Sequence, residues 1–538
     1  MDNLLSKERT KKTKQRHKNA GQSPSDDIKL LERPVVAIIV AAIAGLISVL
    51  GWHAKTIMID GGSPELMLPI ASDAVFALIG LVCVTLLMSI ICPKMLQRNS
   101  RVVLLSILVI LATGMSALLH YYTCTMHMMQ PETAKFMLPF ALAPLLATIL
   151  IGARPGIAVG GWTSLLIALY WGRSLPVFLT GLIATAVAAY AARNVRTRTK
   201  VMRISIIIGL AQITCVLGTT ALNWDNPNVM PVLHQAIASI FGAAISAIIA
   251  LLILPMLEHT FAITTDISLL EFSDLGHPLL QRLALEAPGT YHHSLVVANL
   301  AQAAAESIGA NGLEARVCSY FHDIGKLTKP NFFAENIHMQ HNPHDDIPPS
   351  MSTLVIIAHV KEGLSLAMLN NLPKPVMRAI SEHHGTSMLR FFHNKAQTQL
   401  EFEMDTGEGG TPKVDEGSFR YPGPKPSTKV SAIIGLADAA EAASRSIEKT
   451  SPGHIESLVK DIVHARIDDG QLDDCDLSMK DIAKIKRTFV FTLTNMLHGR
   501  IPYPKDDNKN KQQAKQTSRE QPDDKNSDNL ADKSDTEA

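Results

Sequence analysis

The chain has 538 residues, a length that predicts two to four structural units rather than one compact core. Lys and Arg total 50 and Asp and Glu total 49, so the net charge of +1 argues against a protein that binds DNA or RNA. The six cysteines include no Cys-x-x-Cys pair, which excludes a disulfide scaffold and a cysteine-based zinc site.

Apolar residues are concentrated in the first half of the chain, whereas charged residues and histidines are concentrated in the second half. A transmembrane helix needs about 20 mostly apolar residues to cross a hydrocarbon layer of roughly 30 Å. Eight segments meet this requirement: 34–53, 73–91, 102–121, 136–151, 156–170, 175–192, 204–222 and 231–257. The fourth and fifth are short and lie close together, so a shallow or tilted hairpin is the alternative for this pair.

Lys and Arg recur in alternate loops, which indicates the orientation of the membrane half. Basic residues are frequent in the N-terminal arm, 1–33, and in the loops around Arg98, Arg154 and Arg196. The intervening loops hold few: Lys55, Lys135 and Arg173. Eight crossings with both ends in the cytoplasm fit this alternation, so the sequence predicts an integral protein of the inner or cell membrane.

Two other interpretations of the apolar half are weaker. The first segment begins only at Pro34 and no Ala-x-Ala-like site follows it, so an uncleaved anchor is favoured over a signal peptide. Charged residues within membrane segments mark ion pathways, and here they are scarce apart from Asp73. The membrane half is therefore interpreted as an anchor or sensor rather than a transporter or channel.

The second half has the pattern of polar-faced helices. Helices are predicted over residues 291–308, 313–323, 352–370, 375–384 and 429–447, and two more over 455–465 and 479–497 complete the domain. Gly385 is a predicted C-terminal stop for the fourth of these helices. An irregular excursion is expected over 397–416, and a disordered charged tail over 504–538. The fold class predicted for the whole chain is all-α.

Histidine and aspartate side chains that can bind a metal recur on these separate helices. They are His293, His322, Asp323, His359, His383, His384 and Asp438. Nitrogen and oxygen donors without thiolate suit Mn, Fe, Co or Zn. Seven ligands are too many for one catalytic ion with an open position, but they fit two ions that share a bridging carboxylate.

Several short motifs surround these donors. They are PGTYHHS at 288–294, HDIGK at 322–326, NPHD at 342–345, EHHGT at 382–386, FRYPGPKP at 419–426 and ADAAE at 437–441. Together they resemble the HD superfamily of metal-dependent phosphohydrolases, and more narrowly the seven-transmembrane HD-domain phosphodiesterases, which are known for hydrolysing cyclic di-AMP. The resemblance is strong over 271–447 and mainly topological over 73–257.

This resemblance implies a polytopic helical bundle over 34–257, followed by a cytoplasmic all-helical HD domain over 258–503 that holds two metal ions, usually iron or manganese. It assigns one ion to His293, His322, Asp323 and Asp438. It assigns the other to His359, His383 and His384, with Asp323 as the bridging and catalytic carboxylate.

Four further residues are candidates for contact with substrate. Lys326 lies one helical turn beyond His322 and is expected to hold a phosphate oxygen or to stabilise developing charge, which makes it a second catalytic candidate. Arg420, Tyr421 and Lys425 lie in a Pro/Gly-rich loop, where they are candidates to contact phosphate or base; a purely structural turn is the alternative.

The predicted function is hydrolysis of cyclic di-AMP to linear pApA by a membrane-anchored phosphodiesterase. The alternatives are another phosphorylated substrate (an alarmone, a nucleoside monophosphate or cyclic di-GMP) and a non-catalytic nucleotide-binding receptor. Thr386 stands where a Gly-Tyr-Pro motif of cyclic di-GMP-specific proteins would begin, which argues against cyclic di-GMP. The expected partners are the cyclic dinucleotide, the lipid bilayer and a second copy of the chain, with no nucleic acid polymer.

The sequence departs from the family pattern in one respect. Family members commonly carry a large extracytoplasmic domain after the first membrane helix, whereas about 20 residues, 54–72, separate the first two predicted membrane segments here. An external sensing module is therefore expected to be absent or to come from another chain.

Overall fold

The computed structural model describes residues 64–96, 99–222, 229–337, 341–404, 413–446 and 451–498, and also Gly45. The predicted N-terminal arm, the rest of the first membrane segment and the charged tail lie outside the described residues. Within the described residues there are helices and no strand, and Met388 and Arg420 form one isolated bridge. The prediction of an all-α protein is therefore confirmed.

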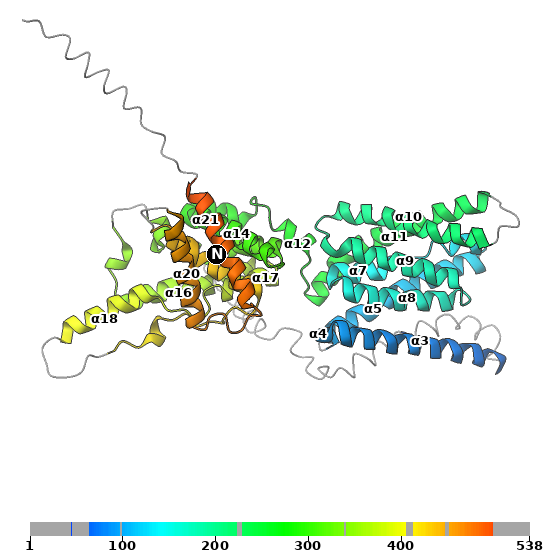
Figure 1. Ribbon diagram of the computed structural model, residues 1–538, viewed down its shortest axis with the longest axis horizontal. Helices are drawn as coiled ribbons and strands as arrows, with labels where there is room; N and C mark the ends of the chain where they lie inside the picture. The colour runs from blue at the N-terminus through cyan, green and yellow to red at the C-terminus, as the bar shows by residue number, and fades with distance from the viewer. Residues whose placement is uncertain are drawn as a thin grey trace, which may run out of the picture.

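The described helices form two bundles that lie end to end along the long axis of the molecule (Figure 1). The N-terminal bundle contains α3 (Pro64–Ile91), α4 (Pro93–Leu96), α5 (Asn99–His120), α6 (Pro131–Ala134), α7 (Leu142–Leu150), α8 (Ala153–Tyr170), α9 (Leu175–Ala191), α10 (Arg198–Leu222) and α11 (Val229–Phe261). Seven of these, all except the four-residue α4 and α6, correspond to the predicted membrane segments from the second onward.

Six helices of the described chain are long and apolar enough to cross a membrane, and five of them, α3, α5, α9, α10 and α11, belong to the N-terminal bundle. The sixth, α16 (Pro349–Leu369), packs against α17 in the C-terminal bundle, where it buries Val360 and Ala367. Asp73, the acidic residue near a membrane boundary, is buried and pairs with Arg173 at 2.9 Å. The protein is therefore a multi-pass membrane protein.

The fourth predicted segment, 136–151, is not one continuous helix. Only α7 is helical within it, and its 9 residues extend roughly 14 Å, about half of the hydrocarbon thickness. Pro139 disfavours helical backbone at the residue before it, which accounts for the turns that precede α7. Gly152, with φ at 135°, then reverses the chain into the 18-residue α8, and a shallow or tilted placement of this pair stays a prediction.

Small residues let α8 and α9 pack closely. A Cβ atom on Gly160 would lie 2.5 Å from the side chain of Thr185 in α9, and one on Gly181 would lie 2.5 Å from Ser164 Oγ in α8. Membrane helices associate through such close backbone approach because lipid provides no hydrophobic driving force between them. The neighbouring Gly161 has only Leu182 near its Cβ position, at 3.9 Å.

The C-terminal bundle begins after α12 (Asp266–Glu271). It consists of α13 (Pro278–Glu286), α14 (Pro288–Ser307), α15 (Gly312–Phe321), α16, α17 (Lys374–Glu382), α18 (Arg390–Met404), α19 (Lys429–Ser444), α20 (Pro452–Asp468) and α21 (Met479–His498). Each helix predicted in this half is present within a few residues of its expected ends. The excursion expected over 397–416 is partly wrong, because α18 extends to Met404 and residues 405–412 lie outside the described part.

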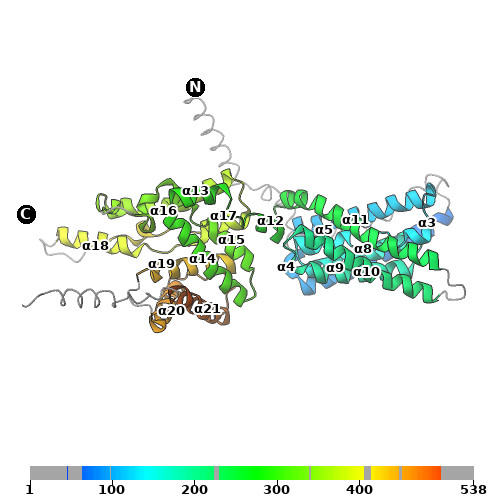
Figure 2. The ribbon, with the colours of Figure 1, turned by 90° about the horizontal axis from the view of Figure 1, so that it is seen from above.

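A polar contact joins the two bundles around α12, which lies between them in both views (Figure 2). Arg198, at the start of α10, donates to Glu271 at 2.8 Å. Asn311 donates to Asp266 at 2.8 Å and also caps α15 by accepting from the Glu314 amide. Since α15 ends next to His322 and Asp323, this contact connects the membrane helices to the part of the chain that carries predicted metal ligands.

We expect Gly160→Ala to destabilise the N-terminal bundle by about 1–3 kcal/mol, because the added methyl overlaps Thr185 and a packed interface tolerates extra volume poorly. Gly161→Ala is the matched control, with open space at its Cβ and the same gain in helix propensity. Thermal unfolding of both variants in the same detergent measures the difference. Equal unfolding midpoints for the two variants would contradict the packing described for α8 and α9.

Candidate metal centre

Helix ends bring the predicted ligands together. His322 and Asp323 directly follow α15, and Asp323 precedes the 3₁₀-helix η4 (Ile324–Thr328). His383 and His384 directly follow α17, and Gly385, with φ at 56°, ends that helix as predicted. Neighbouring residues on a regular helix point about 100° apart, so the irregular backbone at these two ends lets each pair face one centre.

The seven predicted ligands form two groups, in each of which the donor atoms lie within 4.8 Å of one another. One group contains His293, His322, Asp323 and Asp438, and the other contains Asp323, His359, His383 and His384. Asp323 belongs to both groups. Its Oδ2 lies 3.2 Å from His322 Nε2, whereas its Oδ1 lies 3.4 Å from His359 Nε2.

Several of these donor atoms are buried without a hydrogen-bond partner in the described chain. They are Asp323 Oδ1 and the Nε2 atoms of His322, His359 and His383. A buried polar atom that is left unpaired costs free energy, so such atoms in both donor groups fit bound cations. The donor set therefore fits the divalent metal ions that an HD domain is expected to bind.

Hydrogen bonds on the other ring nitrogen orient three of the histidines. Nδ1 of His322 bonds the Ser319 carbonyl at 2.8 Å, and Nδ1 of His383 bonds the Ile380 carbonyl at 3.0 Å. His359 bonds a carbonyl of its own helix in the same way. A proton held on Nδ1 leaves the Nε2 lone pair directed at the centre, which is the tautomer that a metal ligand requires.

The charges of the centre shift the pKa values of its histidines in opposite directions. Burial opposes a charge on His322, but Asp323 and Asp438 outweigh burial and raise its pKa to about 9. Burial lowers the pKa of His359 to about 4, because the charge of Asp323 and the hydrogen bond to the Ile356 carbonyl do not outweigh it. Burial likewise works against the Asp323 carboxylate, yet His322 and Lys326 hold its pKa well below the usual range. The two groups therefore differ in charge as well as in composition.

Comparison with known proteins now agrees with this architecture. Residues 67–265 match the family described as "7TM receptor with intracellular HD hydrolase", and residues 290–443 match the HD domain. This chain belongs to that family. The N-terminal bundle is thus its 7TM region, and the C-terminal bundle, which contains both donor groups, is its HD domain.

Two curated relatives match a large part of the chain. The chain is 37% identical over 307 residues to the protein named cyclic-di-AMP phosphodiesterase PgpH of Bacillus subtilis, covering 57% of this chain and 42% of that protein. It is 35% identical over 383 residues to the protein of the same name in Listeria monocytogenes, covering 69% and 50%. The chain thus spans about half the length of the curated relatives it matches.

Solved structures of the HD domain of Listeria monocytogenes PgpH are 40% identical to this chain. One has a TM-score of 0.38 and covers 41% of this chain and 100% of the solved one. Another, described as a complex with cyclic-di-AMP, has a TM-score of 0.39 and covers 41% and 99%.

Lys326 of the HD domain lies beside the shared carboxylate. Its Nζ is 2.8 Å from Asp323 Oδ2 and 2.8 Å from Glu335 Oε1, and it also lies over the Phe333 ring. Burial opposes its charge, but the two carboxylates outweigh burial and raise the pKa of Lys326. Glu335 in turn accepts from Thr290 Oγ1 at 2.9 Å. No sequence motif pointed to Glu335, because it follows the HDIGK string in an irregular segment.

The three candidates in the Pro/Gly-rich loop have different surroundings. Tyr421 is buried and stacks on His384, with 4.3 Å between ring centroids, so the HD domain places it at the centre. Arg420 instead donates to Asp469 at 2.9 Å and to the Thr386 carbonyl at 3.0 Å. Lys425 lies 3.5 Å from Asp473. Of the three, only Tyr421 contacts a predicted metal ligand.

Two buried glutamates that sequence reasoning missed support the ligands. The carboxylate of Glu441 accepts from His293 Nδ1, and Arg445 lies 2.8 Å from its other oxygen. Glu382 accepts from the Ser427 amide at 3.0 Å and from the Ser427 hydroxyl at 2.7 Å, which ties the loop to the end of α17. The i to i+3 spacing of Asp438 and Glu441 was the signal that places Glu441 on the ligand-bearing face of α19.

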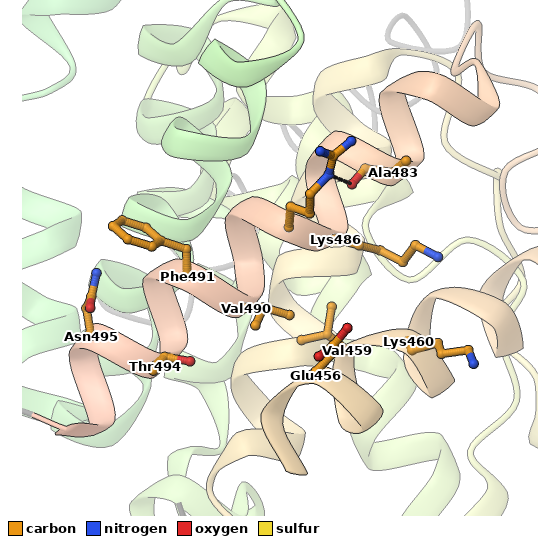
Figure 3. Close-up of a pocket in the computed structure, with 10 residues that line it drawn as sticks. Glu456, Val459, Lys460, Ala483, Lys486, Val490, Phe491, Thr494 and Asn495 are labelled. Carbon is orange, nitrogen blue, oxygen red and sulfur yellow. Dashed lines mark hydrogen bonds between the residues drawn. The ribbon is translucent and has the colours of Figure 1, made fainter. Parts of the chain in front are cut away.

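A groove of about 480 Å³ lies between α20 and α21, and its lining includes Val459, Lys460, Val490 and Phe491 (Figure 3). It contains none of the seven predicted ligands and none of the loop candidates. The chemistry expected of an HD domain therefore lies elsewhere, at the convergence of α14, α15, α16, α17 and α19.

Gly325, in the HDIGK string, is required by the close approach of η4 to α16. A Cβ at this position would lie 1.8 Å from the His359 carbonyl oxygen, a backbone atom that cannot move aside. We expect Gly325→Ala to cost about 3 kcal/mol of stability, since overpacking forces a backbone shift. Gly453→Ala, where nothing lies within 4 Å, is the control. Denaturant unfolding of the metal-free proteins checks this, and a stable Gly325→Ala variant would refute the contact.

Proposed function

We propose that this protein is a membrane-anchored phosphodiesterase that hydrolyses cyclic di-AMP to linear pApA. The observation that carries the proposal is the buried Asp323 carboxylate, whose two oxygens face two separate groups of donors. A centre of this kind suits in-line attack on a phosphodiester. The substrate follows from the two relatives named cyclic-di-AMP phosphodiesterase, which are 37% and 35% identical to this chain.

The proposed centre holds two divalent ions, manganese or iron. His293, His322 and Asp438 would hold one, His359, His383 and His384 the other, and Asp323 both. Such ions lower the pKa of bound water and neutralise charge on the phosphoryl group. The chain's own part is to fix the histidines through their Nδ1 bonds, to keep the ligands buried and to hold Lys326 next to Asp323.

Two residues are proposed to meet the substrate directly. Lys326 provides a buried cation that exchanges one of its two carboxylate partners for a phosphate oxygen. Tyr421 offers an aromatic face next to His384 for a base or ribose. Arg420 and Lys425, which pair with Asp469 and Asp473, act by holding the loop that carries Tyr421.

The HD domain is proposed to face the cytoplasm, with both chain ends on the same side. Basic residues support this orientation, because Arg193, Arg196 and Arg198 gather at the end of the 7TM region that adjoins α12. A cytoplasmic site gives the enzyme access to a nucleotide made inside the cell.

The test uses the full chain in nanodiscs, loaded anaerobically with manganese or iron. Cyclic di-AMP, cyclic di-GMP and a guanosine tetraphosphate are incubated in parallel and separated by chromatography. We expect linear product from cyclic di-AMP alone. Absence of cleavage by folded, metal-loaded protein would contradict the proposal, and light scattering on the same sample measures whether the chain dimerises.

Asp323→Ala is expected to remove metal and activity together, because both donor groups lose their common ligand. Turnover should fall by a factor on the order of 10³ or more, equivalent to about 4 kcal/mol of transition-state stabilisation. Elemental analysis gives the metal content and chromatography the rate. A folded Asp323→Ala variant with full activity would rule out the shared-carboxylate scheme.

Glu441→Gln tests the carboxylate behind His293. The amide keeps the shape of the side chain but removes its charge, and loss of such an outer partner lowers metal affinity by about 10- to 100-fold. Metal competition with a chelator measures this, with the exposed Glu456→Gln on α20 as a control away from the centre. Unchanged affinity in Glu441→Gln would show that this carboxylate only packs against the ring.

A further inference from the structure

Arg466 lies at the edge of the metal centre, in the last turn of α20. With His383, His384 and Gln471 it lines a cavity of about 10 Å³, which is room for about one water molecule. Helix α20 packs on α19, which carries Asp438. Its position gives Arg466 access to the histidine-rich group without making it a ligand.

Five of the other cations around the centre are paired with carboxylates, whereas Arg390, whose charge opposes that of Arg466, is not among them. These pairs are Lys326 with Asp323 and Glu335, Arg420 with Asp469, Lys425 with Asp473, Lys429 with Asp481, and Arg445 with Glu441. Within the described chain, the guanidinium of Arg466 takes part in none of the ion pairs or side-chain hydrogen bonds. It is therefore a positive charge that still has all of its donors to offer.

The carboxylates whose fields reach Arg466 are bound to other groups. Burial lowers the pKa of Arg466, and Asp438 and Asp469 counteract burial. Asp438 lies 3.0 Å from His293 Nε2 and is a predicted metal ligand. Asp469 accepts from Arg420 at 2.9 Å and from Gln471 at 2.9 Å. An arginine keeps its proton even when buried, so a positive charge without a carboxylate partner of its own in the described chain stands at this edge of the centre.

The metal centre is most exposed at His384 and Asp438. The side chains of His384 and Asp438 are 16% and 11% exposed, whereas those of the other five predicted ligands are at most 4% exposed. Tyr421, which stacks on His384, also lies within the field of Arg466. His384 therefore connects Tyr421, which stacks on it, with Arg466, which lines the same small cavity as His384.

We propose that Arg466 is a substrate-binding residue, which holds a phosphate of the cyclic dinucleotide on the His384 side of the centre; this inference rests on the proposed function. A guanidinium suits the role because its planar donors bind two phosphate oxygens at once. Arg466 and Lys326 then bind phosphate oxygens at different places in the centre. Lys326 lies next to Asp323 Oδ2, and Arg466 lines the same cavity as His384.

The experiment compares Arg466→Gln with Arg487→Gln in the full chain in nanodiscs. Arg487 is a matched control: it is exposed on α21, has no carboxylate partner in the described chain, lines the groove between α20 and α21, and donates to the Ala483 carbonyl. We expect Arg466→Gln to raise KM for cyclic di-AMP at least tenfold, with kcat within threefold and metal content and unfolding midpoint unchanged. Arg487→Gln should match the wild type in every measurement.

Arg466→Lys keeps the charge but loses the paired donors, so its KM should lie between those of the wild type and Arg466→Gln. If Arg466→Gln fails to fold, Arg466→Lys tests whether Arg466 binds substrate. We then expect its KM to be at least threefold above that of the wild type. A KM within twofold of wild type in whichever of these Arg466 variants folds overturns the inference about Arg466. The proposed function still stands in that case, provided that the wild-type protein hydrolyses cyclic di-AMP. Equilibrium dialysis with radiolabelled cyclic di-AMP tests the inference about Arg466 separately from the proposed function. The inference requires tenfold weaker binding by Arg466→Gln than by the wild type, even if the wild type proves inactive.

Discussion

The HD domain is organised around a carboxylate that is buried between two groups of histidines. Asp323 has almost no contact with solvent, and its two oxygens face different donors. Such an anion is stable in a protein interior only when cations surround it, and Lys326 supplies one of them. The helix ends, the glycine contact of η4 and the ordered ring nitrogens all serve to keep that arrangement fixed.

Many ligands of this centre were predictable from the sequence, because they lie in short motifs at the ends of predicted helices. The His-Asp and His-His pairs stand where helical periodicity ends, and Gly385 has the positive φ that its place after α17 suggests. The two groups of donors that the structure brings together are those that the motifs indicate. Residues such as Glu335 and Arg466 were not predictable, since only the tertiary packing of the 3₁₀-helix η6 (Ala334–Asn336) and of α20 near the centre gives them a role.

The membrane half shows where reasoning from hydropathy fails. Apolar composition alone made 136–151 a membrane helix, but α7 is fully surrounded by its neighbours and so can be short. Hydropathy measures the preference for an apolar environment and does not separate lipid from a protein interior. The same limit explains α16, which is apolar enough to span a membrane yet carries His359 in the HD domain.

The length of α11 sets where catalysis takes place in the cell. Its 33 residues extend roughly 50 Å, whereas the hydrocarbon layer takes up about 30 Å. The remaining turns end at α12, so the HD domain is held close to the lipid headgroups. If the HD domain faces the cytoplasm and cleaves cyclic di-AMP as proposed, the anionic dinucleotide must approach through the negative surface potential of that leaflet, which reaches about one Debye length, roughly 8 Å, into solution. Lipid composition thereby becomes a determinant of how fast substrate arrives.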